Sequence, residues 1–176
     1  MKNWIRFITA LVMVSFSAAG YPQWTVGSRS FGGGPWTYYT STSPTATQCT
    51  ATYGVANPCS AINSYNWSSQ SVSGTITLYV VTSGAVAISQ VAGNGEAVIY
   101  YSTNGGCNEE YSLKVYNYAN VGTLSWTDDI QSTTISLTDL SNLCVQLYAY
   151  GDAASVSGAS VTSQISPVSI YVTVSH

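Results

Sequence analysis

Residues 96–118 read Glu96-Ala-Val-Ile-Tyr-Tyr-Ser102, Thr103-Asn-Gly-Gly-Cys-Asn-Glu109 and Glu110-Tyr-Ser-Leu-Lys-Val-Tyr-Asn-Tyr118. The outer two runs are β-prone, and Asn-Gly-Gly between them tolerates the positive φ of tight turns. We therefore expect a central β-hairpin. The second run alternates with a period of two, which predicts one buried face and one exposed face. The expected buried residues are Tyr111, Leu113 and Val115, and the expected exposed ones are Ser112, Lys114, Tyr116 and Tyr118.

Alternating segments on both sides of the hairpin predict further short strands. We expect them at residues 75–82, 85–91, 124–127, 133–137, 143–150 and 168–174. Asp128 and Asp129 separate the strands expected at 124–127 and 133–137, and residues 49–73 read as loop-rich. Residues 138–142 can form one helical turn capped by Thr138 or Asp139. The aliphatic positions predict a core of Ile76, Leu78, Val80, Leu143, Val145, Leu147, Ala149, Val168, Ile170, Val172 and Val174.

Eight or so short strands without crossover helices predict an all-β fold, an antiparallel two-sheet β-sandwich. The strand count favours a jelly-roll-like topology over an immunoglobulin-like one. We expect residues 45–176 to form this single domain. Residues 21–44 are an extended arm rich in Gly, Pro and aromatic residues. The arm either lies across its own domain, which we favour, or pairs with a neighbouring molecule.

Residues 1–20 have the pattern of a signal peptide: Lys2 and Arg6, then an apolar run, then Ser17-Ala-Ala-Gly20. Its removal leaves two cations, Arg29 and Lys114, against seven acids, which is a net charge of −5. So few cations argue against nucleic acid as a partner, and against a membrane once the signal is cleaved. The expected location is secreted: extracellular, periplasmic or on the cell surface. A sequon, Asn66-Trp67-Ser68, is relevant only if the source glycosylates its exports.

Four cysteines follow the signal peptide, and an even number in an exported chain predicts disulfides. We favour the pairs Cys49–Cys59 and Cys107–Cys144 among the three possible connectivities. Zinc is the competing interpretation, which the lack of a Cys-x-x-Cys spacing and of a nearby histidine disfavours.

No catalytic motif is evident, and we expect no enzyme activity. His176, the only histidine, is the last residue, and Lys114 lies on a sheet face where little would lower its pKa. Glu96 and Glu110 on the two hairpin arms leave a small glycosidase-like enzyme as a lesser alternative. No cofactor is expected, although a weak Ca²⁺ site could draw on Glu109, Glu110, Asp128 and Asp129.

Tyrosines recur on the strand positions opposite the aliphatic ones, which predicts a tyrosine-rich outer sheet face. These candidate binding residues are Tyr79, Tyr116, Tyr118, Tyr148, Tyr150 and Tyr171. Tyrosine suits sugar stacking and protein interfaces, although high β-propensity alone also explains its presence. We expect a carbohydrate-binding or adhesive surface module whose partner is a polysaccharide or surface glycan. The alternative is a structural subunit of an extracellular fibre or coat, held by self-association.

Overall fold

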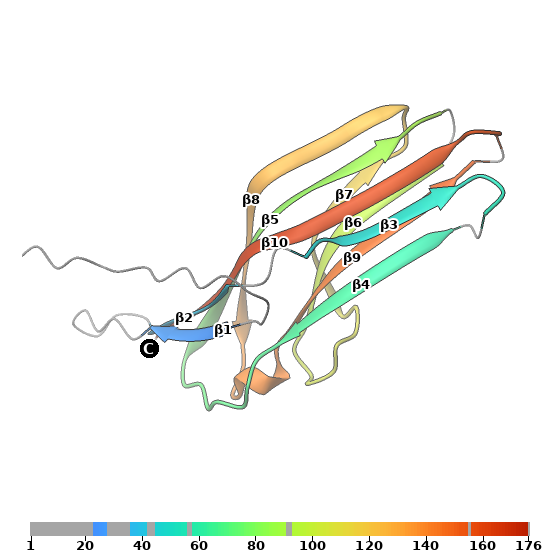
Figure 1. The fold of residues 1–176 in the computed structure, drawn as a ribbon. Coiled ribbons are helices and arrows are strands. Elements are labelled where there is room, and N and C mark those ends of the chain that lie inside the picture. The colour runs from blue at the N-terminus through green and yellow to red at the C-terminus, as the bar shows by residue number, and fades with distance from the viewer. Residues whose placement is uncertain are drawn as a thin grey trace, which may run out of the picture.

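Two antiparallel sheets pack face to face in the computed structural model (Figure 1). It describes residues 23–27, 36–41, 45–55, 58–90, 93–154 and 156–175, with backbone alone at 23–27, 36–41 and 175. The expected signal peptide and His176 lie outside the described residues. The strands are β1 Gln23–Gly27, β2 Trp36–Ser41, β3 Thr47–Thr52, β4 Cys59–Asn66, β5 Thr75–Ile88, β6 Gly93–Ser102, β7 Tyr111–Tyr118, β8 Gly122–Ser136, β9 Cys144–Ala153 and β10 Ser160–Ser175.

The larger sheet has the strand order β1-β2-β10-β5-β8, with β3 also paired to β10, and the smaller has the order β4-β9-β6-β7. The eight strands from β3 onward pair in a nested way: β3 with β10, β4 with β9, β5 with β8 and β6 with β7. The prediction of an all-β antiparallel two-sheet sandwich is therefore confirmed. The prediction that residues 49–73 are loop-rich is wrong, because β3 and β4 occupy much of this segment.

The strands within the expected arm join the larger sheet of the same chain. β1 pairs with β2, and β2 pairs with β10 from Trp36↔Val174 to Thr40↔Ile170. β3 covers another part of β10, from Thr47↔Ile165 to Thr52↔Ser160. Of the described residues, none belongs to a helix long and apolar enough to cross a membrane.

The core lies between the two sheets and consists mainly of aliphatic side chains. Leu147 on β9, Ile99 on β6 and Val172 on β10 are fully buried. Most of the expected core residues are buried as predicted: Ile76, Leu78, Val80, Leu143, Val145, Leu147, Ala149, Ile170, Val172 and Val174. Strict alternation places these side chains on the inner faces, so the period-two pattern identified the interior correctly.

A β-bulge in β7 changes which residues face inward. Ile99 pairs with Lys114 and Tyr100 pairs with Ser112, so Leu113 is an extra residue in β7. An extra residue reverses the alternation beyond it. The predicted phase is therefore wrong after the bulge: Val115 is 47% exposed and Tyr116 is only 7% exposed.

Bulges also explain the other differences in strand assignment. Residues 75–82 and 85–91 were expected as two strands, but the single strand β5 runs from Thr75 to Ile88. Asp128 and Asp129 lie within the continuous strand β8, where Asp128 has a φ of 49° and the pairing with β5 shifts. In β10 the shift falls between Pro167 and Ser169, and it leaves Val168 exposed instead of buried.

Both expected disulfides are present. Cys49–Cys59 joins β3 of the larger sheet to β4 of the smaller, and Cys107–Cys144 joins the β6–β7 loop to β9. By the loop-entropy model each such link stabilises the fold by about 3 to 4 kcal/mol. Disulfides form in oxidising compartments, so the pair indicates an extracellular type of environment.

The expected helical turn is a 3-10 turn, η1, at Leu140–Asn142, with Asp139 as its N-cap. The Asp139 carboxylate accepts hydrogen bonds from the Ser141 amide at 2.8 Å, the Ser69 hydroxyl at 3.0 Å and the Gln70 amide at 3.3 Å. These bonds, those from Ser141 first, lower the pKa of Asp139 to about 2. They also tie η1 to the segment between β4 and β5.

Stability should fall in acid partly through Asp139. Its pKa of about 2 in the fold lies below the value of about 3.9 in an unfolded chain. The stabilisation is therefore present above about pH 4 and is lost as the pH falls through about 2. We expect Asp139→Asn to lower the thermal midpoint at pH 7 and to flatten its decline below about pH 4. The midpoint, followed by circular dichroism, checks this. A decline for Asp139→Asn that runs parallel to that of the wild type would contradict the assignment.

Candidate contact surface

Two of the six candidate tyrosines do not lie on an outer face. Tyr116 is buried in the core, and Tyr118, which is partly buried, packs against it. Both were expected to point outward, and both point inward because the bulge at Leu113 reverses the phase of β7. They therefore belong to the interior of the sandwich.

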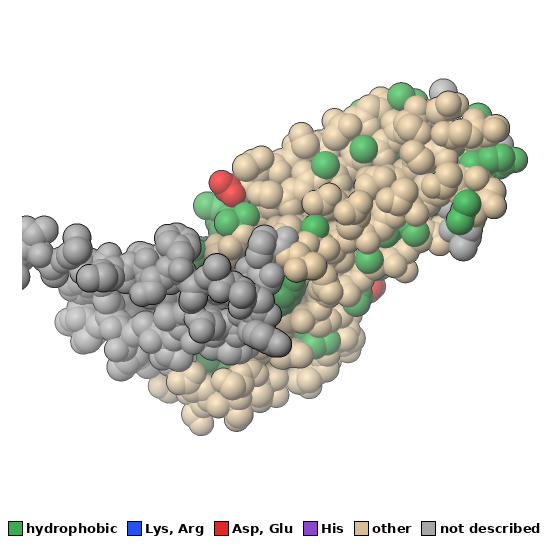
Figure 2. Space-filling view, viewed as in Figure 1, with side chains coloured by type: hydrophobic (Ala, Val, Ile, Leu, Met, Phe, Trp, Pro, Cys, Tyr) green, Lys and Arg blue, Asp and Glu red, His purple; other side chains and the backbone are tan. Residues whose placement is uncertain are grey.

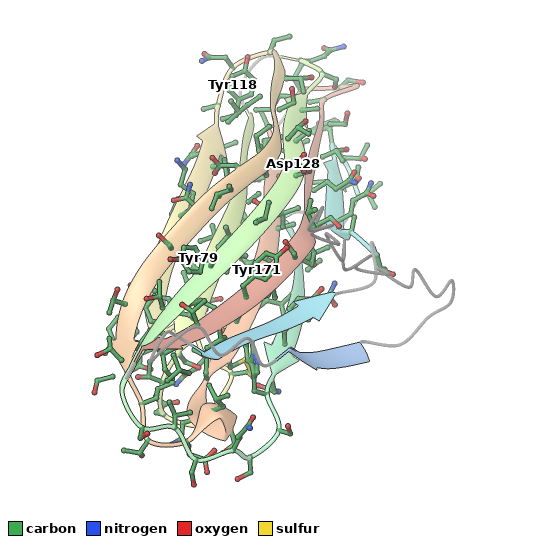
Figure 3. The ribbon with its side chains drawn as sticks, turned by 90° about the vertical axis from the view of Figure 1, so that its left-hand side faces the viewer. Tyr79, Tyr118, Asp128 and Tyr171 are labelled. Carbon is green, nitrogen blue, oxygen red and sulfur yellow. A yellow bond between two sulfur atoms is a disulfide. The ribbon has the colours of Figure 1, made fainter. Side chains whose placement is uncertain are left out.

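The other four candidates divide between opposite sides of the molecule. Tyr79 on β5 and Tyr171 on β10 are paired neighbours on the outer face of the larger sheet (Figure 3). Tyr148 and Tyr150 on β9 lie on the outer face of the smaller sheet. The prediction that the tyrosines share one face is therefore wrong, since the two sheets turn their outer faces in opposite directions.

Tyr116 closes the side of the sandwich between β7 and β8. Its ring stacks on Trp126 with centroids 3.8 Å apart and planes 3° apart. Its hydroxyl donates to the Asp129 carboxylate and lies 3.3 Å from the Thr82 hydroxyl, to which the Trp126 indole N–H donates at 3.2 Å. Burial first, and then the hydrogen bond to Asp129, raise the pKa of Tyr116 well above its usual value. The same bond lowers the pKa of Asp129.

Trp126 can reach this position because residue 84 has no side chain. A Cβ on Gly84 would lie 2.3 Å from the Trp126 ring and 2.3 Å from the Gln164 carbonyl oxygen. The bulge in β5 occurs between Thr82 and Gly84, opposite the bulge at Asp128. These irregular positions hold the stack of Tyr116 and Trp126 in place. A structural role therefore accounts for these two aromatic residues.

The outer face of the smaller sheet carries a continuous row of apolar side chains. Ile62 pairs with Tyr148, Tyr148 with Val98, and Val98 with Val115, so the row crosses all four strands. Ile62 is 46% exposed and Val115 47% exposed, whereas Val98 between them is covered. We call this surface the tyrosine face; it comprises Ile62, Val98, Tyr100, Val115, Tyr148 and Tyr150.

Three tyrosine rings lie together on the tyrosine face. Tyr148 is 6.1 Å from Tyr100 and 6.5 Å from Tyr150, measured between ring centroids. The planes of Tyr148 and Tyr150 differ by 16° and those of Tyr100 and Tyr148 by 54°. In the view of Figure 2, by contrast, hydrophobic side chains lie scattered over a surface with few charges. The tyrosine face thus combines rings and aliphatic groups in one patch.

Carboxylates border the tyrosine face. Glu96 lies across from Tyr150, in the cross-strand row next to the apolar row, and accepts a hydrogen bond of 2.8 Å from the Asn117 side-chain amide. Asp152 follows on the same face of β9, and Glu109 lies in the β6–β7 loop. Burial first raises the pKa values of Tyr100 and Tyr148, and the negative charges of Glu109 and Glu96 raise them further. The two hydroxyls therefore remain protonated donors at neutral pH.

The β6–β7 loop covers one end of the same sheet face. The Gln146 side-chain amide donates to the Cys107 carbonyl at 3.4 Å and to the Ser64 hydroxyl at 3.2 Å. Cys144 and Gln146 were expected outward and exposed, but they are 1% and 4% exposed. The β6–β7 loop, anchored by the Cys107–Cys144 disulfide, covers these two side chains. The tyrosine face is the part of the outer face of the smaller sheet that this loop does not cover.

The acids considered for catalysis or Ca²⁺ occupy separate settings. Glu110 accepts bonds from the amide and hydroxyl of Thr103, whereas Asp129 accepts from Tyr116 and Gln131. Asp128 accepts from Ser83 on the neighbouring strand. Within the described ranges, no three His, Cys, Asp or Glu residues lie close enough together to hold a metal ion. The structure therefore does not assemble the four weak Ca²⁺ candidates into one site.

The molecule is an all-β, two-sheet antiparallel sandwich whose smaller sheet carries an apolar row on its outer face. No protein-family model matches the chain, and no curated protein matches it. A chain in the structure of infectious bursal disease virus, Gt strain, is 14% identical with a TM-score of 0.40, over 80% of this chain and 33% of that one. A chain in the structure of the Gx strain is 16% identical with a TM-score of 0.38, over 80% of this chain and 32% of that one. The chain spans about a third of these viral chains, and likeness this distant carries no functional argument.

Sequence reasoning missed most of the apolar row. Ile62 shares its strand face with Ser60 and Ser64 in a segment that read as loop, and Val115 was assigned to the core. Val98 and Tyr100 lie in a nearly continuous apolar run, in which alternation cannot tell one face from the other. The available signal was Tyr148-Ala-Tyr150, whose outward phase was predicted correctly.

Proposed function

We propose that this chain is a secreted, non-catalytic β-sandwich subunit that the tyrosine face holds to a protein partner in an extracellular coat, fibre or adhesive layer. The observation that carries the proposal is the apolar row, whose ends at Ile62 and Val115 are about half exposed at 46% and 47%. Exposed apolar groups that form one patch, and do not lie scattered, mark interaction sites. Tyrosine is also enriched at protein interfaces.

Carbohydrate binding is the second candidate. The support is the nearly parallel pair Tyr148 and Tyr150, 6.5 Å apart, since flat rings with hydroxyl groups suit sugar stacking. The two aliphatic ends of the row favour a protein, because Ile62 and Val115 offer a sugar neither a ring nor a hydrogen bond. We therefore place the protein partner first.

The absence of enzyme activity is part of the proposal. The carboxylates that could act as a pair, Glu96 and Glu110, are each held by neighbouring donors, Asn117 and Thr103. We also infer a jelly-roll connectivity. The nested pairing from β3·β10 inward to β6·β7 supports it, because that is the pairing of one long hairpin folded over into two sheets.

Removing the apolar row should release the protein from its assembly. For the double variant Ile62→Ser, Tyr148→Ser, we expect the ratio of protein in the medium to protein in the cell-surface or coat fraction to rise at least about tenfold. This corresponds to a loss of about 1.4 kcal/mol of binding free energy. Fractionation of the source culture followed by immunoblotting measures this. The thermal midpoint should change little, because both side chains lie on the surface.

Ile130→Ser is the matched control. Ile130 is 64% exposed on β8 of the larger sheet, so this substitution removes an exposed isoleucine, as Ile62→Ser does, but away from the tyrosine face. The control should fractionate as wild type. Wild-type fractionation of the double variant would refute the proposal. Retention on a polysaccharide column that the double variant loses would favour the carbohydrate candidate instead.

A further inference from the structure

We propose that the partner of the tyrosine face is a basic protein segment, which presents lysine or arginine side chains between apolar ones. This inference rests on the proposed function of the face as a protein-contact surface and adds the chemistry of the partner. It follows from the distribution of charge around the apolar row.

Charge on and around the tyrosine face has a single sign. Glu96, Glu109 and Asp152 lie on it or at its border. Lys114 is the one cation in the described part of the chain, and it lies on the inner side of β7, 5.5 Å from the ring centroid of Tyr116. Lys114 therefore forms no ion pair with Glu96 or Glu109 on the tyrosine face. A partner that carries positive charge would gain from them.

The rings add a second attraction for cations. A lysine or arginine over the face of a tyrosine is attracted by the ring's quadrupole. Tyr100, Tyr148 and Tyr150 form a group with centroids 6.1 and 6.5 Å apart, so a cation above Tyr148 has rings on both sides. Glu96 lies directly across the strand pair from Tyr150, in the cross-strand row next to the apolar row. The tyrosine face thus places carboxylates next to aromatic rings.

The aliphatic ends of the row specify the rest of the partner. Ile62 lies on the outer strand β4 and Val115 on the outer strand β7. Four strands about 4.8 Å apart place these ends about 14 Å from each other, which equals about four residues of extended chain. A short segment with apolar residues at its ends and a basic residue between them matches this order.

A second copy of the same chain fits the face less well. Two tyrosine faces placed together would bring two sets of carboxylates into one interface, without a described cation between them. Like charges brought together at an interface disfavour association. The chain without residues 1–20 also has seven acids and two cations. The charge distribution therefore favours a partner with a different, basic surface.

Fluorescence anisotropy with synthetic peptides tests the inference. The probe is a labelled peptide Gly-Val-Ser-Lys-Ser-Val-Gly, in which two valines four positions apart and the lysine between them share one face of the extended chain. Its counterpart carries glutamate in place of the lysine. We expect the basic peptide to bind at least about tenfold more tightly in about 0.05 M salt, and the difference to shrink in about 0.5 M salt. Glu96→Gln with Glu109→Gln should weaken its binding about threefold to tenfold.

Asp128→Asn is the charge control. It removes one carboxylate from β8 of the larger sheet, where asparagine also tolerates the positive φ of 49°. Binding of the basic peptide should be unchanged in this variant. Glu96→Gln keeps an oxygen that can accept from Asn117, so the double variant should retain the wild-type thermal midpoint.

Each contrary result has a distinct meaning. Equal binding of the two peptides, weakened equally by Tyr148→Ser, would overturn the basic partner while the face remained a contact surface. Binding of neither peptide would also overturn the inference. If a chitosan oligosaccharide bound at Tyr148 and the basic peptide did not, the partner would be a cationic sugar, and both this inference and the protein-contact function would fail.

Discussion

Replacing Tyr116 with alanine is expected to lower the free energy of unfolding by about 3 to 5 kcal/mol, the range for truncating a buried aromatic ring. The ring is 7% exposed and stacks on Trp126 at 3.8 Å, so its removal leaves a cavity between β7 and β8. It also removes the hydroxyl that donates to Asp129. Urea denaturation measures the loss, and association through the tyrosine face should be unchanged.

Tyr116→Phe separates the ring from its hydroxyl. This variant keeps the stack with Trp126 and removes only the hydrogen bonds to Asp129 and Thr82. We expect a cost of about 1 to 3 kcal/mol, from polar groups left without a partner. If Tyr116→Ala instead left stability unchanged and abolished association, Tyr116 would be a contact residue and the inward phase of β7 after Leu113 would be wrong.

Replacing Leu147 with alanine should cost about 2 to 5 kcal/mol, as for other fully buried leucines. Leu147 is completely buried on β9 between its cross-strand neighbours Asn63 and Ile99. The midpoint of urea unfolding should fall without a change in its slope, since the same surface is exposed on unfolding.

Val115→Ala is the matched control for Leu147→Ala. Val115 lies on the same sheet but is 47% exposed on the outer face, so its truncation should stay within about 0.5 kcal/mol. Similar losses for the two variants would show that the inner and outer faces have been assigned incorrectly.

Local alternation in the sequence was enough to predict the sandwich and most of its core. Ile76, Leu78 and Val80 show why: each alternates with polar or aromatic residues in a strand whose pairing is regular there. The disulfide pairs were also predictable, because Cys49–Cys59 is a short link and Cys107 lies in the hairpin loop.

The candidate surface was predictable only to a limited extent, because its composition depends on bulges and on tertiary cover. One extra residue at Leu113 moved Tyr116 inward and Val115 outward, and no local pattern in β7 indicates that insertion. Gln146 alternates as an exposed residue should, yet the loop carrying Cys107 covers it. Neither effect can be derived from the strand that it changes.

The nested pairing has a consequence for how the chain folds during synthesis. β10 is an inner strand of the larger sheet, bonded to β5 along one edge and to β2 and β3 along the other, yet it is synthesised after the other nine described strands. Until it emerges, those three strands each lack a partner at an edge that the finished protein covers. The β6–β7 hairpin, whose strands are joined directly by the loop at residues 103–110, can form early. Folding should therefore spread outward from the middle of the chain, at the slow rates of β proteins dominated by distant pairings. Unpaired strand edges would meanwhile be open to aggregation until β10 is available.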